Sequence, residues 1–138
     1  MIIKYYDIKI GPNSKRKDLT VFANLSKYRL FTPGYDYRLS SLWNGCKNAD
    51  YHERYSLAVA YDKKIPVGVV IFEPDDKNFL SCFIKPDYRG KGLANKLAKI
   101  VVEKNNYPTI WCLGKSQSIL AKIGYTKNSK NRKMEFTK

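Results

Sequence analysis

Polar residues separate the apolar positions near the start of the chain, as expected of a half-buried strand. These apolar positions are Ile2, Tyr5, Ile8 and Ile10. Gly11-Pro12-Asn13 follows them, and its composition predicts a turn. In residues 18–31 the apolar positions recur at helical spacing, with Asp18 as the expected N-cap and Thr32-Pro33-Gly34 as the end. We therefore predict a strand over residues 2–10, a helix over 18–31 and a second short helix over 37–46.

The middle of the chain has the pattern of a β-hairpin. Two apolar runs, residues 57–61 and 67–72, flank the turn sequence Asp62-Lys63-Lys64. Glu73-Pro74-Asp75-Asp76 predicts another turn after the second run. These residues should therefore form two antiparallel strands.

The most informative segment passes from an apolar run through two glycines into a helical pattern. Residues 79–84 predict a buried strand, ended by Pro86, and apolar residues recur at helical spacing from Leu93 onward. Gly90 and Gly92 let the backbone approach a ligand closely. The free amides of the first helical turn point outward with the positive end of the helix dipole. The segment therefore predicts an anion site, suited to a phosphate-containing cofactor.

The C-terminal part continues the alternation of strands and helices. After a break at residues 105–108, we predict a strand over residues 109–113 and a helix over 116–123 that ends at Gly124-Tyr125. Residues 133–137 predict a last strand. The sequence shows neither an internal repeat nor a low-complexity linker, so we expect a single domain over residues 1–138.

Composition narrows the class of protein. The sequence has neither a signal peptide nor an apolar run of about 18 residues, so we expect a soluble, cytoplasmic protein without a membrane span. Cys46, Cys82 and Cys112 are odd in number and far apart, which favours buried thiols over disulfides. With His52 as the single histidine and no C-x-x-C pair, we expect no metal site.

The charge is unusual for a small enzyme. The net charge is +14 and the isoelectric point is near 9.7. A phosphate-containing cofactor needs only a few positive charges, so the remaining positive charge indicates nucleic acid, an acidic protein partner or merely solubility. Charge alone does not choose among these three.

The segment Ile84-Lys85-Pro86-Asp87-Tyr88 followed by Arg89-Gly90-Lys91-Gly92-Leu93-Ala94 resembles the acetyl-CoA-binding motif of the GNAT N-acetyltransferase superfamily. The later strand, helix and Gly-aromatic pair are also similar to that family. The resemblance extends from about residue 57 to the end of the chain. It implies an α/β (α+β mixed sheet) fold of the GNAT type, with a central, mostly antiparallel sheet and helices on both faces.

The resemblance also implies the cofactor-binding residues. In the family, the pyrophosphate of acetyl-CoA lies over the backbone amides of the glycine turn and the helix start, and the pantetheine arm pairs with the preceding strand. Asn95 and Lys96 are placed to add side-chain donors. The positions that match are Phe83, Ile84, Arg89, Gly90, Lys91, Gly92, Leu93, Ala94, Asn95 and Lys96.

The catalytic residues are less clear, because Leu120 stands where many family members have a tyrosine that acts as general acid. Ser116 is a candidate donor to the leaving thiolate, although a serine at this place is more often a helix N-cap. Asp76 is a candidate general base, with Glu73 and Asp75 nearby, although turn chemistry also explains it. His52 has a suitable pKa but a surface role is commoner. Positioning alone remains an alternative.

The resemblance implies an acyl-CoA-dependent N-acyltransferase that moves an acetyl group directly from acetyl-CoA, its co-substrate, to an amine. The alternative is a catalytically weak GNAT-like binding protein that holds nucleic acid or an acidic protein. The intact turn favours the enzyme, and Leu120 favours the binding protein. The sequence does not identify the acceptor amine, and it does not show whether the protein is a monomer or a homodimer.

Overall fold

The computed structural model describes residues 1–12, 14–30, 53–112, 114–128 and 135–138. The strands are β1 (Ile2–Ile10), β2 (Glu53–Asp62), β3 (Ile65–Glu73), β4 (Asn78–Ile84), β5 (Thr109–Cys112), β6 (Thr126–Lys127) and β7 (Glu135–Thr137). The α-helices are α1 (Arg16–Lys27), α3 (Leu93–Asn105) and α4 (Gln117–Lys122), and the short 3-10 helices are η1 (Pro86–Tyr88) and η2 (Gly114–Ser116).

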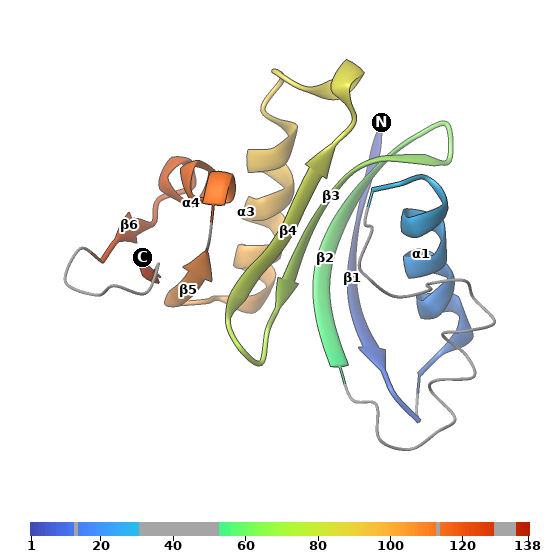
Figure 1. The fold of residues 1–138 in the computed structure, drawn as a ribbon, viewed down its shortest axis with the longest axis horizontal. Coiled ribbons are helices and arrows are strands. Elements are labelled where there is room, and N and C mark those ends of the chain that lie inside the picture. The colour runs from blue at the N-terminus through green and yellow to red at the C-terminus, as the bar shows by residue number, and fades with distance from the viewer. Residues whose placement is uncertain (13, 31–52, 113, 129–134) are drawn as a thin grey trace.

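In these residues the strands form one sheet, in the order β1-β2-β3-β4-β5-β7-β6. Every neighbouring pair is antiparallel except β4 and β5, which run parallel. Figure 1 shows α1 on one face of the sheet and α3 on the other. The predicted mixed sheet, mostly antiparallel with helices on both faces, is therefore confirmed.

The central strands divide their side chains between two apolar cores. In β2, Leu57 and Val59 pack with α1, whereas Ala58 and Ala60 pack with α3. Successive residues of a strand point to opposite faces, so a strand covered on both faces must be apolar at every position. This requirement explains why β2 and β3 appear in the sequence as continuous apolar runs.

Gly68, in β3, sets how closely α3 approaches the sheet. A Cβ at this position would lie 2.8 Å from Ile84 Cδ1 and 3.3 Å from Leu93 Cδ2. The glycine therefore lets the first turn of α3 sit directly against the start of β3 and the end of β4, where the anion site was predicted.

Gly68→Val is expected to lower the free energy of unfolding by about 1–3 kcal/mol, because its added methyl groups overpack the contact with α3. Gly68→Ala should cost less, since the atom nearest to its Cβ is the mobile end of the Ile84 side chain. Urea unfolding of both variants measures the difference. A Val variant as stable as the parent would contradict this packing.

Two helices differ from their predicted bounds. The first, α1, starts two residues earlier than expected, with Lys15 at the N-cap and Asp18 inside the first turn. There the Asp18 carboxylate faces the positive end of the helix dipole instead of capping it. The helix also ends earlier, at Lys27, because Arg29 adopts a left-handed backbone with φ 60°. The last predicted helix begins as the 3-10 helix η2 and becomes α4 only at Gln117.

Some predicted elements and residues fall outside the described part of the chain. The helix predicted over residues 37–46 lies outside it, as do Cys46, His52 and the first two residues of the strand predicted over 133–137. The short strand β6 was not predicted. In the described residues, no helix is both long enough and apolar enough to span a membrane.

The turn between β2 and β3 has the predicted position but an unexpected backbone. Lys63 and Lys64 both have positive φ, 50° and 68°, which a two-residue hairpin turn of type I′ requires. Asparagine followed by glycine is the preferred sequence for such a turn, and lysine is strained there. The backbone of this turn is therefore strained at both lysines.

The double variant Lys63→Asn/Lys64→Gly is expected to raise the free energy of unfolding by roughly 1–2 kcal/mol, because it relieves the strain of the two left-handed residues. Chemical denaturation of this variant beside the parent measures the gain. A less stable variant would show that the lysine side chains stabilise the turn by more than their backbone strain costs.

Candidate active site

Strand β4 is open along most of one edge. Its parallel pairing with β5 is confined to Asn78 with Trp111 and Phe79 with Cys112. Beyond Phe79 the described residues supply no further ladder between the two strands, and Figure 1 shows β5 as a short strand beside the long β4. The backbone of β4 beyond Phe79 is therefore free to pair with an extended ligand, as a sheet edge does when it gains a strand.

The backbone direction at the end of β4 shows which residues face this open edge. The amide of Lys85 donates to the Val67 carbonyl of β3 at 2.9 Å. Because backbone groups alternate along a strand, Phe83 also faces β3 and Ile84 faces the open edge. Arg89 Nε donates to the Ile84 carbonyl at 2.7 Å, which agrees with this direction. Of the two predicted strand residues, Ile84 is thus the one whose backbone a ligand can reach.

The glycine turn has the backbone that the sequence motif predicts. Gly90 and Gly92 have φ values of 78° and 75°, in the left-handed region that favours glycine. Gly92 occupies the N-cap position of α3 and makes no side-chain capping bond. A Cβ on either glycine would meet no atom within 4 Å, so both face open space. The turn is therefore strained for other residues but leaves room beside its backbone.

A cavity of about 340 Å³ lies over this turn and the start of α3. The first turn of α3 carries no acidic residue. The amides of its first residues have no acceptor within the helix, so they and the helix dipole present partial positive charge to the cavity. These features fit an anion such as a pyrophosphate.

Most of the predicted cofactor residues line this cavity. They are Ile84, Arg89, Gly90, Gly92, Leu93, Ala94 and Asn95. Phe83, Lys91 and Lys96 do not line it and are exposed. Tyr88, Ile119 and Lys122 also line it, although sequence reasoning did not assign them to the site. Ile119 and Lys122 come from α4, which only the tertiary fold brings beside the turn.

The candidate donor Ser116 follows the end of β5. It occupies the N-cap position of α4 but makes no side-chain capping bond, and it is half-buried. Leu120 is fully buried in the core on the α3 face. Burial raises the pKa of the Cys112 thiol to about 11, so this group is protonated near neutral pH. Ser116 does not line the cavity over the glycine turn.

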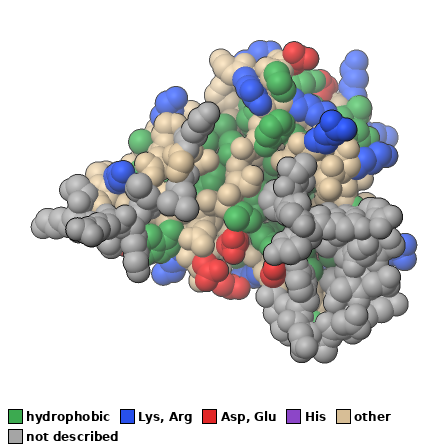
Figure 2. All heavy atoms as spheres, viewed as in Figure 1, with side chains coloured by type: hydrophobic (Ala, Val, Ile, Leu, Met, Phe, Trp, Pro, Cys, Tyr) green, Lys and Arg blue, Asp and Glu red, His purple; other side chains and the backbone are tan. Residues whose placement is uncertain are grey.

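Acidic side chains gather where β3 turns into β4. Glu53, Glu73, Asp75 and Asp76 line a cavity of about 260 Å³, here called the acidic hollow, together with Arg54 and Tyr55. Figure 2 shows Asp and Glu side chains clustered at the lower end of the sheet. The Trp111 amide donates to the Lys77 carbonyl at 2.8 Å and ties this turn to β5. The hollow therefore lies close to the point where β4 and β5 separate.

Glu73 is a carboxyl group of this hollow whose pKa is raised by its surroundings. Burial raises its pKa, and the negative charges of Asp76 and Glu53 and a hydrogen bond with Asp76 raise it further. A carboxylate with a raised pKa is a stronger base than an ordinary glutamate. The structure thus places the predicted base Asp76 beside Glu73, a second carboxyl group in the same hollow.

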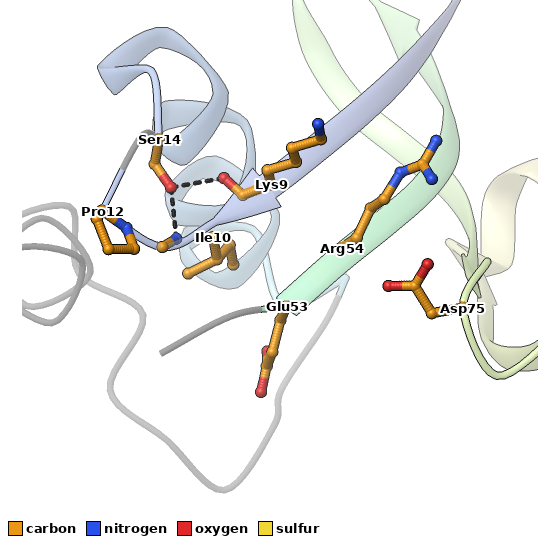
Figure 3. Close-up of a pocket in the computed structure, with 8 residues that line it drawn as sticks. Lys9, Ile10, Pro12, Ser14, Glu53, Arg54 and Asp75 are labelled. Carbon is orange, nitrogen blue, oxygen red and sulfur yellow. Dashed lines mark hydrogen bonds between the residues drawn. The ribbon is translucent and has the colours of Figure 1, made fainter. Parts of the chain in front are cut away.

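The acidic hollow continues into a second hollow of about 240 Å³ at the end of β1, shown in Figure 3. Glu53, Arg54 and Asp75 line both. In the part of the second hollow that is not shared, the Ser14 hydroxyl donates a hydrogen bond to the Lys9 carbonyl at 2.6 Å. Together the two hollows could receive a side chain longer than a simple amine.

Arg54 also lines the acidic hollow, but its ion pair is with Asp7, which does not line it. Its Nε and Nη2 donate to the two carboxylate oxygens of Asp7 at 3.0 and 2.8 Å. The same bonds lower the pKa of Asp7.

The described residues contain no group of three or more His, Cys, Asp or Glu that could hold a metal ion.

Comparison with known proteins agrees with this architecture. The sequence model of the acetyltransferase (GNAT) domain matches residues 44–135. No curated protein sequence matches the chain.

Solved structures share the fold at low sequence identity. One is a predicted acetyltransferase from Clostridium acetobutylicum solved with acetyl-CoA, which is 14% identical with a TM-score of 0.54 and coverage of 94% of both chains. Tetrahymena GCN5 is 13% identical with a TM-score of 0.52, over 91% of this chain and 82% of that chain. A chain of the NatC complex bound to Gag peptide and CoA is 17% identical with a TM-score of 0.53, over 99% and 96%. With the family match over residues 44–135, the chain belongs to the GNAT acetyltransferase family.

Proposed function

We propose that this protein transfers an acetyl group from acetyl-CoA directly to an amine. The observation that carries the proposal is the continuity of two features: the open edge of β4 leads straight to the uncapped first turn of α3. An extended thioester arm suits the first, and a pyrophosphate suits the second. Structural neighbours solved with acetyl-CoA or CoA support the same assignment.

The residues that would hold acetyl-CoA follow from the cavity over the turn. The amides of Leu93, Ala94 and Asn95 receive the pyrophosphate, with Gly90 and Gly92 leaving space for its oxygens. The outward-facing backbone of Ile84 begins the pairing with the pantetheine arm, and the Arg89 side chain must then release the Ile84 carbonyl. Phe83, Lys91 and Lys96 would contribute charge or contact from outside the cavity.

The acidic hollow would receive the acceptor. Its carboxylates attract a protonated amine, and Glu73, with Asp76 beside it, takes the proton that the amine must lose before it can attack. Bound acetyl-CoA supplies the thioester, whose acetyl carbon bonds to the amine nitrogen while its C–S bond breaks. The Ser116 hydroxyl donates a hydrogen bond to the sulfur, which stabilises the departing thiolate.

Amine-dependent release of free CoA thiol tests the proposal. Purified protein with acetyl-CoA is offered spermidine, a lysine peptide and a peptide with a free N-terminal amine. We expect release with at least one amine and its loss in the Glu73→Gln variant. Tight acetyl-CoA binding without release for any cationic amine would contradict transfer.

Ser116→Ala is expected to lower kcat by roughly 10-fold to 100-fold, the value of one hydrogen bond to a charged group. KM for acetyl-CoA should change little, because the bond to sulfur strengthens only as the thiolate forms. Steady-state kinetics measure both constants, and Ser118→Ala on the same helix serves as the control. An unchanged kcat would remove Ser116 from the mechanism.

One observation favours the binding protein as a second candidate. Leu120, at the position of the usual general acid, is wholly buried in the core. If the chain has lost efficient catalysis, it would bind acetyl-CoA without turnover and use its basic surface for nucleic acid or an acidic protein. The release experiment separates the two candidates.

A further inference from the structure

A cavity larger than the one over the glycine turn and than either hollow at the acidic end lies at the other end of β1. Its volume is about 490 Å³. The start of β1, one side of α1 around Val21 and the β2–β3 turn form its walls. Cavities that bind small molecules have volumes of roughly 300–1,000 Å³. The size therefore suits a small ligand and not a polymer.

The interior of this cavity is aromatic and apolar. The hydroxyl groups of Tyr6 and Tyr61 lie 2.9 Å apart and share one hydrogen bond, in which one donates and the other accepts. Burial and this hydrogen bond raise the pKa of Tyr61, which keeps its ring neutral. Ile2 and Val21 add apolar surface. An aromatic ring would find flat and apolar partners here.

The rim of the same cavity is positively charged. Lys4, Lys63 and Lys64 line it, and Lys4 Nζ lies 6.0 Å from the centre of the Tyr61 ring. Among the described residues of the lining, Asp62 is the one carboxylate, and it accepts a hydrogen bond from the Tyr88 hydroxyl. Figure 2 shows Lys and Arg side chains gathered at the upper right, the end where Figure 1 places the β2–β3 turn. The rim therefore favours an anion.

The strained backbone of the turn supports a ligand role for these lysines. Lys63 and Lys64 both have positive φ, although asparagine and glycine would fit the turn better. Strained residues cluster at functional sites, so the turn is a reasonable place to look for a ligand contact.

We propose that this cavity binds a small anion that carries an aromatic ring. The ring would lie against Tyr6 and Tyr61, and the anionic group would face Lys4, Lys63 and Lys64. A mononucleotide and a simple aromatic phosphate share this chemistry. Among the described residues this cavity shares no lining residue with the cavity over the cofactor turn, although the hydrogen bond from Tyr88 to Asp62 connects the two. The proposal does not depend on acetyl transfer.

Amide-resolved NMR titration tests the site with phenyl phosphate as the probe. The Gly92→Glu variant is titrated in parallel with the parent, so that binding of phosphate at the cofactor turn is recognised and set aside. We expect saturable shifts at Tyr6, Tyr61 and Val21 in both proteins. Inorganic phosphate and phenol should each bind at least 10-fold more weakly, and either one binding as tightly as phenyl phosphate would overturn the proposal.

Adenosine monophosphate distinguishes the two ligand sources in the same titration. Tighter binding than phenyl phosphate at these residues identifies the ligand as a nucleotide, and weaker binding identifies a simpler aromatic anion. If neither probe shifts the amide signals of the residues that line this cavity, the proposed site is wrong.

The variant Lys63→Asn/Lys64→Gly provides the second test, because it should be more stable than the parent yet bind phenyl phosphate at least 10-fold more weakly. Lys99→Gln/Lys127→Gln removes the same charge elsewhere on the surface and should bind as the parent does. Parent-like binding by the turn variant, or an equal loss in the control, would overturn the role of the rim.

Discussion

Gly92→Glu is expected to weaken acetyl-CoA binding by at least about 100-fold, since placing like charges against each other costs several kcal/mol. Gly92 has φ 75°, and a side chain there would project into the open space beside the turn. The added carboxylate would stand where the pyrophosphate must meet the amides of α3. It would also satisfy those amides itself, as an acidic residue at a helix start does.

Titration calorimetry of the parent and the variant with acetyl-CoA measures this loss. Gly124→Glu is the matched control, because Gly124 also has positive φ and open space around it but does not line the cofactor cavity. The control should retain parent-like affinity. An equal loss in both variants would mean that strain or net charge, and not the turn, accounts for the effect.

Glu73→Gln is expected to lower kcat by about 100-fold to 1,000-fold, within the range contributed by a general base. The amide keeps the size of the side chain but cannot accept the proton of the amine. Affinity for acetyl-CoA should remain unchanged, because Glu73 does not line the cofactor cavity. Steady-state kinetics with a reactive amine measure kcat, and a loss confined to acetyl-CoA binding would contradict the assignment.

The pH dependence gives a sharper form of the same prediction. Glu73 acts in its deprotonated form, so kcat/KM should rise with pH through a pKa above the ordinary value for glutamate. Asp76→Asn removes a negative charge that raises this pKa, so the rise should move to lower pH. Asp75→Asn should leave it in place, because Asp75 is not among the groups that shift Glu73. A rise that moves equally in both variants would exclude Glu73 as the titrating group.

The strand, the turn and α3 were predictable from the sequence because their signals are local. Pro86 ends the strand, Gly90 and Gly92 permit the turn, and apolar spacing from Leu93 defines the helix. Each feature acts within a few residues, so no tertiary contact is needed to recognise it. The hairpin at Lys63-Lys64 was found in the same way, although its strained backbone was not.

The parts that depend on distant residues could not be predicted. The separation of β4 from β5 is a matter of pairing between strands that are about 30 residues apart in sequence. Gly68 looks like an ordinary strand glycine until α3 packs on it. The fold brings Glu53 and Glu73 together in the acidic hollow. From the sequence we predicted Asp76 as the base, because it is closer to β4 along the chain. The pKa of Glu73 is raised first by burial, and no local sequence pattern reveals how buried a side chain is.

The central claim is that acetyl-CoA binds along the open edge of β4 and over the first turn of α3. Amide-resolved NMR of the parent during titration with acetyl-CoA tests it most directly. The account predicts one saturable site, with the largest shifts at Ile84, Gly90, Gly92, Leu93, Ala94 and Asn95. Absence of binding, or saturable shifts confined to residues away from β4 and the glycine turn, would contradict it.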